Sequence, residues 1–207
     1  MAGAQVSTDN LLISELKHRL ANSFQLLQAV VQIRLRSATD PESRRHLSWL
    51  LDVVTALSML QQRIGFSGPT DFGAYLIEAA TYWRRVCEGR AIDIVLDVSQ
   101  VQVSETEAST LALIAHELIS NAMEHAFPHG RAGVIELSFH QRHDGARELM
   151  VRDDGVGLSE AKGKGQSQGL ELVQGLAEHL GGRVTFDGGN GVAVRIVTPR
   201  ADGPRPN

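Results

Sequence analysis

Residues 11–64 carry apolar side chains at intervals of three and four along two stretches, with one short break between them. In the first stretch these positions are Leu12, Leu16, Leu20, Leu27, Val31 and Leu35. In the second they are Leu47, Leu50, Leu51, Val54, Leu57 and Leu60. The spacing predicts two amphipathic helices, about 11–35 and 41–64. Because the connection is so short, we expect the helices to lie antiparallel as a hairpin.

The break itself, "TDPES", contains the signals that start a helix. Asp40 suits the N-cap, Pro41 the first helical position and Glu42 the first turn. An isolated hairpin cannot bury two apolar stripes well. Pairing with a second copy into a four-helix bundle would cover them, so a homodimer through residues 11–64 is expected.

After the linker "GFSGPT", residues 65–70, the pattern changes to alternating helices and strands. A helix is predicted at 71–86, a strand at 91–98, and a long helix that opens with the capping box "SETE" at 104–107 and runs to Phe127 before Pro128. Further strands are expected at 133–142, 147–155, 183–187 and 191–199, and a helix at 169–180 closed by Gly181 and Gly182.

The fold class that follows is α+β. We expect a dimerising two-helix hairpin at residues 1–65, an α/β sandwich at 71–200 and a disordered tail at 201–207. The chain of 207 residues, 43% apolar, is large enough to build these cores.

Composition excludes several functional classes. A formal net charge of −4 argues against a nucleic-acid-binding protein, and the single cysteine, Cys87, permits no internal disulfide. The amino terminus carries no secretion signal, and no run approaches the ~18 apolar residues of a membrane span. We therefore expect a cytoplasmic protein with no direct membrane insertion.

The segment "HELISNAMEH" places polar side chains on one helix face. Glu117 and Asn121 are four residues apart, and His125 extends the same face by another turn. A carboxylate and an amide oxygen side by side suit Mg²⁺, which keeps waters and accepts phosphate oxygens as further ligands. Taken alone, the pattern is better explained by a polar helix face that meets water.

A second polar segment, "VRDDGVGL", ends a predicted strand. Asp153 can accept a hydrogen bond from an exocyclic amine such as that of adenine, while Gly155 and Gly157 let the backbone approach a flat ligand. Taken alone, this segment is better explained by an ordinary Asp-Gly turn. Next follow Lys162 and Lys164, which could reach phosphates, and a helix that opens at Gly169.

In this order and spacing, residues 71–199 resemble the ATP-binding domain of the histidine kinase, gyrase and Hsp90 superfamily. "HELISNAMEHAFP" resembles the N box, "DDGVGL" the G1 box and "SQGLELVQGLAEHLGG" the G2 region. The resemblance implies ATP with its adenine near Asp153 and Mg²⁺ at Asn121, with Glu117 beside it. The nucleotide-binding residues that it implies are Asn121, His125, Asp153, Gly155, Gly157, Lys162, Lys164, Gly169 and Leu170.

The segment "ELKHRLANSFQLLQ" in the first predicted helix resembles the phosphoacceptor box of the HisKA_2/HWE-type histidine kinases. Glu15, His18, Arg19 and Asn22 match its pattern. A lone histidine on a helix is usually an ordinary surface residue. Ahead of a nucleotide-binding domain, the resemblance implies that His18 is the phosphoryl acceptor and that Glu15, one turn earlier, orients its ring.

The expected function is that of a two-component histidine kinase core. ATP would phosphorylate His18 with help from Glu15 and Glu117, and the phosphoryl group would pass to an aspartate on a response regulator. Input would come from a longer chain or from a separate sensor protein.

The sequence departs from the family pattern at three positions. Ala21 and Glu124 stand where the family has lysine, and Gln168 where it has leucine. Glu124 favours an alternative function, a histidine phosphotransferase of the same fold that no longer uses ATP productively. A sequestering switch protein that binds ATP would explain the second domain only.

Overall fold

The chain folds as two compact units, residues 1–68 and 69–207. The structure, a computed structural model, describes residues 2–63, 69–157 and 168–200. The predicted linker lies mostly outside the described residues, and the predicted tail lies wholly outside them. Among the described helices, none combines the length and the apolar character needed to cross a membrane.

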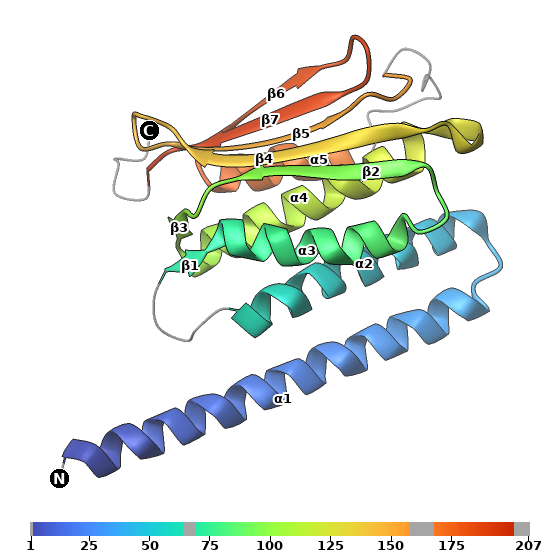
Figure 1. The fold of residues 1–207 in the computed structure, drawn as a ribbon. Coiled ribbons are helices and arrows are strands. Elements are labelled where there is room, and N and C mark those ends of the chain that lie inside the picture. Colours follow the sequence, from blue (N-terminus) through green and yellow to red (C-terminus); the bar gives the residue numbers. More distant parts are fainter. Residues whose placement is uncertain (1, 64–68, 158–167, 201–207) are drawn as a thin grey trace. The chain divides into compact units, whose positions relative to one another are not determined.

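The first unit is a pair of helices, α1 (Ala2–Ser37) and α2 (Pro41–Arg63), that pack against each other (Figure 1). Asp40 caps α2 by accepting a hydrogen bond from the Ser43 backbone N–H at 2.8 Å, which lowers the pKa of this carboxyl. Arg44 donates to the carbonyls of Leu35 and Ala38 near the end of α1. The predicted hairpin is confirmed, although α1 begins well before residue 11.

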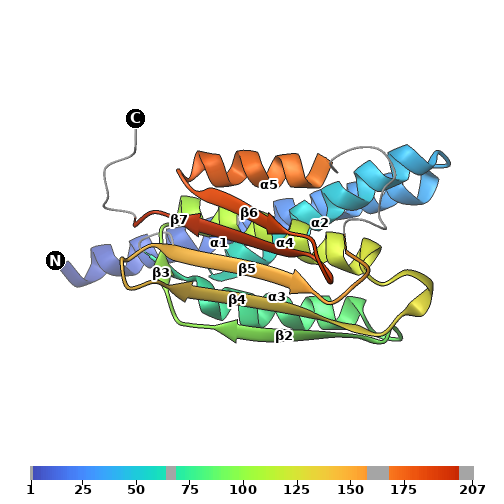
Figure 2. The ribbon, with the colours of Figure 1, turned by 90° about the horizontal axis from the view of Figure 1, so that it is seen from above.

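The second unit is built on a five-stranded sheet with the order β2-β4-β5-β7-β6 (Figure 2). Its strands are β2 (Ile92–Val98), β4 (Gly133–Gln141), β5 (Arg147–Asp153), β6 (Arg183–Asp187) and β7 (Ala193–Thr198). Strands β2 and β4 pair in parallel, and the other neighbours pair antiparallel. The crossover between β2 and β4 contains the long helix that carries the N-box residues.

Three helices cover one face of this sheet: α3 (Phe72–Val86), α4 (Glu105–His125) and α5 (Gln168–His179) (Figure 1). Apolar side chains fill the layer between them. The buried strand residues on this face include Ile94, Ile135, Leu137, Phe139, Leu149, Val151, Val194 and Ile196. The Trp83 indole N–H donates to His116 Nδ1 at 3.1 Å, which ties α3 to α4 inside the core. The predicted sandwich is confirmed.

Several details differ from the prediction. Helix α4 ends at His125 rather than Phe127, and Pro128 opens a short 3₁₀ helix, η1 (Pro128–Gly130). Two-residue strands β1 (Thr70–Asp71) and β3 (Gln102–Val103), which were not predicted, form a separate small sheet. Strand β1 directly precedes α3, and β3 directly precedes α4.

The capping box at the start of α4 is only half formed. Ser104 Oγ accepts a hydrogen bond from the Glu107 backbone N–H at 3.2 Å, as predicted. The Glu107 carboxylate, however, lies 2.9 Å from Arg147 Nη1 and accepts a hydrogen bond from the Thr198 hydroxyl at 3.0 Å. A buried ion pair with β5 therefore replaces the predicted contact with the Ser104 backbone.

Candidate nucleotide-binding site

The last two turns of α4 place two of the predicted residues together. Glu117 is buried, and Asn121 is partly buried one turn later. Asn121 Nδ2 donates a hydrogen bond to Glu117 Oε1 at 2.9 Å. Because the amide nitrogen is held by the carboxylate, the amide oxygen of Asn121 points away from it and is available to a ligand.

This arrangement fits a magnesium ion that arrives with a nucleotide. Mg²⁺ is usually held by one or two protein oxygens, with waters and phosphate oxygens completing its octahedron. Among the described residues, no cluster of three or more His, Cys, Asp or Glu side chains could hold a metal alone. Asn121 Oδ1 would supply the protein ligand, and Glu117 would orient Asn121 through the observed hydrogen bond. Direct coordination by Glu117 stays a prediction.

Asp153 lies at the end of β5, where its carboxylate is almost completely buried. Its Oδ1 accepts hydrogen bonds from the backbone N–H groups of Gly155 at 2.9 Å and Val192 at 3.3 Å. Burial raises the pKa of this carboxyl, and the two N–H groups oppose the increase. Since both bonds use Oδ1, Oδ2 is the atom that can accept from an exocyclic amine.

The glycines after Asp153 are required by close backbone contacts. A Cβ on Gly155 would lie 2.8 Å from the Ala126 carbonyl carbon, and one on Gly157 would lie 2.8 Å from the Gly189 oxygen. Gly157 also has a φ of 74°, which glycine adopts readily. The Val156 N–H donates to the Ala126 carbonyl at 3.1 Å. This loop therefore joins the end of α4 to the β6–β7 turn.

Gly169 brings the first turn of α5 against the same face of α4. A Cβ at this position would collide with the Glu117 carboxylate and lie 2.8 Å from Asn121 Nδ2. Glu117, Asn121 and Gly169 are therefore neighbours, and Leu170, partly exposed, follows in the helix. Lys162 and Lys164 lie outside the described residues, so their predicted contact with phosphates stays a prediction.

Glu124 and His125 are both exposed at the end of α4. The Glu124 carboxylate lies 3.9 Å from His125 Nε2. The acidic side chain thus neighbours the histidine that was expected to contact the nucleotide. Glu124 can therefore offset a positive charge on His125 when the imidazole is protonated.

His18 lies on α1 in the first unit, where it is exposed. Glu15 is exposed on the same helix, and its carboxylate accepts hydrogen bonds from Arg19 Nη2 at 2.7 Å and Arg19 Nε at 3.1 Å. His18 itself is exposed, and the carboxylate of Glu15 is engaged by Arg19. Orientation of the His18 ring by Glu15 stays a prediction, because the observed partner of Glu15 is Arg19.

The sequence did not single out three residues that shape this site. Arg131 Nη2 donates to the Asp154 carbonyl at 2.9 Å and is one of the groups that lower the pKa of Asp153. Ala126 and Val192 hold the glycine loop and Asp153 through backbone atoms. Backbone contacts leave no residue-type signal, and Arg131 lies in a segment whose only pattern is that of a turn.

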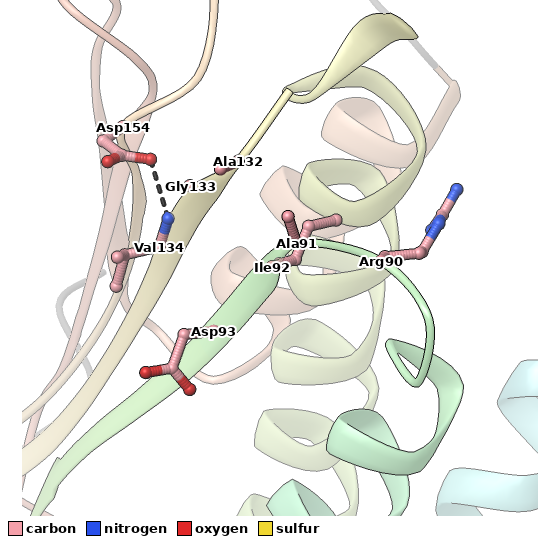
Figure 3. Close-up of a pocket in the computed structure, with 8 residues that line it drawn as sticks. All are labelled: Arg90, Ala91, Ile92, Asp93, Ala132, Gly133, Val134 and Asp154. Atoms are coloured by element: carbon pink, nitrogen blue, oxygen red, sulfur yellow. Dashed lines mark hydrogen bonds between the residues drawn. The ribbon is translucent and has the colours of Figure 1, made fainter. Parts of the chain in front are cut away.

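A surface hollow lies at the amino ends of β2 and β4 (Figure 3). Asp154 lines it and accepts a hydrogen bond from the Val134 N–H at 2.8 Å. Asp154 thus fastens the end of β5 to β4, whereas its neighbour Asp153 faces the glycine loop. None of the predicted site residues lines this hollow.

Comparison with known families agrees with this geometry. The histidine kinase-like ATPase domain profile matches residues 88–198, and a second profile, described as histidine kinase (HisKA_2), matches residues 15–88. The chain belongs to the histidine kinase family. Both matches cover the segments that carried the resemblance in the sequence.

The individual relatives that the chain matches are also named histidine kinases. The chain is 28% identical over 204 residues to blue-light-activated histidine kinase 2 of Erythrobacter litoralis, covering 90% of this chain and 56% of the relative. It is 25% identical over 209 residues to the sensor histidine kinase PdtaS of Mycobacterium tuberculosis, covering 91% and 40%. The chain thus spans about half the length of these relatives.

Among solved structures, the fold is similar to the histidine kinase domain of the blue-light-activated kinase EL346 from Erythrobacter litoralis. The TM-score is 0.66 at 25% sequence identity, with 86% of this chain and 95% of that one covered.

Proposed function

We propose that the second unit binds Mg²⁺-ATP, that the γ-phosphoryl group passes to His18, and that a receiver-domain aspartate of a response regulator then accepts it. The observation that carries the proposal is the juxtaposition of Glu117, Asn121 and Gly169, joined through the end of α4 to the buried Asp153. The same chain presents an exposed histidine on a helix of the first unit.

Each group has a defined chemical role in this proposal. Asp153 Oδ2 accepts the adenine amino group, and Asn121 Oδ1 ligates the ion that neutralises the phosphates. The neutral imidazole of His18 attacks the γ-phosphorus, the bond to the β–γ bridging oxygen breaks, and ADP leaves. The exposed imidazole passes its N–H proton to solvent as the N–P bond forms. Positioning and charge neutralisation supply most of the catalysis.

The partners follow from the same proposal. A homodimer would form through the hairpin, where Leu26, Leu27, Val30 and Ile33 of α1 and Trp49 and Leu50 of α2 are exposed apolar residues. A sensory input would come from another domain or a separate protein. The named relatives are sensor histidine kinases, which gives no support to the phosphotransferase alternative.

Labelled ATP tests the kinase function directly. Wild type should acquire an acid-labile label, and His18→Ala should acquire none, whereas His143→Ala, a change in an exposed loop, should label like wild type. A phosphorylated regulator offered as donor supplies the second arm. If His18 accepts phosphate from the regulator but never from ATP, the protein is a phosphotransferase, and no label from either donor refutes both functions.

The dimer is tested on the exposed positions. Ile33→Glu places a charge on an exposed apolar residue and should convert the dimer to a monomer in light scattering. Leu51 and Val54 were the positions suggested by the sequence pattern. Val54 is buried, so a charge there would also disturb the folded chain. A wild-type monomer at micromolar concentration would contradict the proposed dimer.

A further inference from the structure

Strand β2 is the first strand of the sheet order β2-β4-β5-β7-β6, so one of its long sides has no neighbouring strand in the described sheet (Figure 2). On its inner side, the Ala91 carbonyl accepts from the Gly133 N–H, and the Ser99 N–H donates to the Phe139 carbonyl. Alternate residues of a parallel strand face its partner. The backbone groups of Ile92, Ile94, Leu96 and Val98 therefore point outward.

The central outward residue, Ile94, is capped by side chains. Its carbonyl accepts hydrogen bonds from Arg84 Nη2 at 2.7 Å and Arg84 Nε at 3.2 Å. Its N–H donates to Asp93 Oδ1 at 2.8 Å. Arg84 comes from the last turn of α3. Asp93 projects from β2 itself (Figure 3). Both outward polar groups of Ile94 are thus satisfied within the chain.

An uncapped edge of this kind would be a template for another strand. At seven residues β2 has the length of an ordinary strand, and Val95 on its open face is 45% exposed. Two such edges can pair around a two-fold axis, because the same surface then serves both molecules. With Ile94 capped, the outward backbone groups that could still pair are those of Ile92 before it and those of Leu96 and Val98 after it. Neither part is long enough for a stable ladder.

We propose that Arg84 and Asp93 form an edge block that prevents β2 from pairing with the β2 edge of a second copy of this chain. Both side chains are needed, because Arg84 covers the carbonyl and Asp93 covers the N–H of Ile94, and removing either one leaves a backbone group open to a second strand. None of these residues takes part in the proposed nucleotide site. The edge block is therefore independent of the kinase function.

The test uses the whole chain and a double variant, Arg84→Met with Asp93→Ala. Methionine keeps an unbranched stem while removing the donors. Size-exclusion chromatography with light scattering should show a mass about twofold that of wild type at the same concentration, as expected for edge pairing between existing assemblies. The matched control is Arg85→Ala, which removes the adjacent exposed arginine and should leave the mass unchanged.

A suppressor tests the mechanism. Adding Val95→Lys to the double variant places a charge on the uncovered edge and should restore the wild-type mass. An unchanged mass in the double variant, an equal increase in Arg85→Ala, or no rescue by Val95→Lys would overturn the proposal. If circular dichroism shows that the double variant is unfolded, Asp93→Ala alone decides, since this side chain is exposed. An unchanged mass in that variant then overturns the proposal.

Discussion

The polar side chains at the two ends of helix α4 differ in their burial and in their partners. At its start, the Glu107 carboxylate is buried and takes both of its partners, Arg147 and Thr198, from the same chain. At its end, Asn121 is only partly buried and Glu124 is exposed. The fold thus satisfies the polar side chain at one end of α4, whereas the polar side chains at the other end stay in contact with solvent. The proposed function assigns the nucleotide to this second end.

The largest expected effect comes from breaking the start of α4. Arg147→Met leaves the Glu107 carboxylate buried without its cation, so the free energy of unfolding should fall by about 3–5 kcal/mol. Urea denaturation measures the change. Replacing both residues, Glu107→Leu with Arg147→Met, should recover much of the loss, because no unpaired charge remains. A loss below about 1 kcal/mol in the single variant would show that the ion pair is not structurally important.

Breaking the nucleotide site, which joins the end of α4 to Asp153 at the end of β5, should change binding and leave stability largely intact. Asp153→Asn replaces a carboxylate acceptor by a neutral amide, and ATP should bind about ten- to a hundredfold more weakly, the value of a hydrogen bond to a charged group. A titration with fluorescent nucleotide measures the change. Asp144→Asn, an exposed substitution in a loop, is the control. Equal affinity for wild type and Asp153→Asn would refute the adenine assignment.

A substitution at the carboxyl end of α4 should instead strengthen ATP binding. Glu124→Lys exchanges an exposed carboxylate for a cation near the proposed phosphate position. Because the group is exposed, the effect should be modest, about 0.2–1 kcal/mol or up to roughly fivefold tighter ATP binding. Glu88→Lys makes the same charge change at an exposed turn and should bind like wild type. A weaker affinity in Glu124→Lys would show that the carboxylate itself supports the nucleotide.

The smallest effect concerns pH. Burial raises the pKa of Asp153 in the folded state, so the folded chain binds this proton more tightly than the unfolded chain does. The corresponding stability is therefore present below the ordinary carboxyl pKa and lost as pH rises through the raised value. Relative to Asp153→Asn, wild type should lose unfolding free energy across this window in urea titrations. A parallel pH dependence of the two proteins would contradict the assignment.

The sequence predicted those elements whose signals are local. Asp40 and Ser104 cap helices where their residue type and position indicated, and the two long apolar repeats became α1 and α2. Helix α4 follows the capping-box signal at Ser104. Strands β1 and β3 were missed, because two residues cannot establish a periodicity. The role of Glu107 was missed for a different reason. Its partners lie 40 and 91 residues away in the chain, at Arg147 and Thr198.

The same distinction applies to the candidate site. Spacing along one helix was enough to place Glu117 beside Asn121, since residues four apart share a face. The contact between Gly169 and Glu117 joins two helices and depends on tertiary packing, which spacing does not determine. Backbone donors such as the Val192 N–H have no counterpart in residue type at all.

Trp83, held inside the second unit by its hydrogen bond to His116, can report unfolding through its intrinsic fluorescence. The protein has two tryptophans, Trp49 in the hairpin and Trp83 in the second unit. Trp49 is 42% exposed, while Trp83 is fully buried, so their emission maxima should differ. A red shift of the buried component alone would report opening of the second unit. Denaturation followed by emission wavelength can thus reveal whether the two units melt together or one before the other.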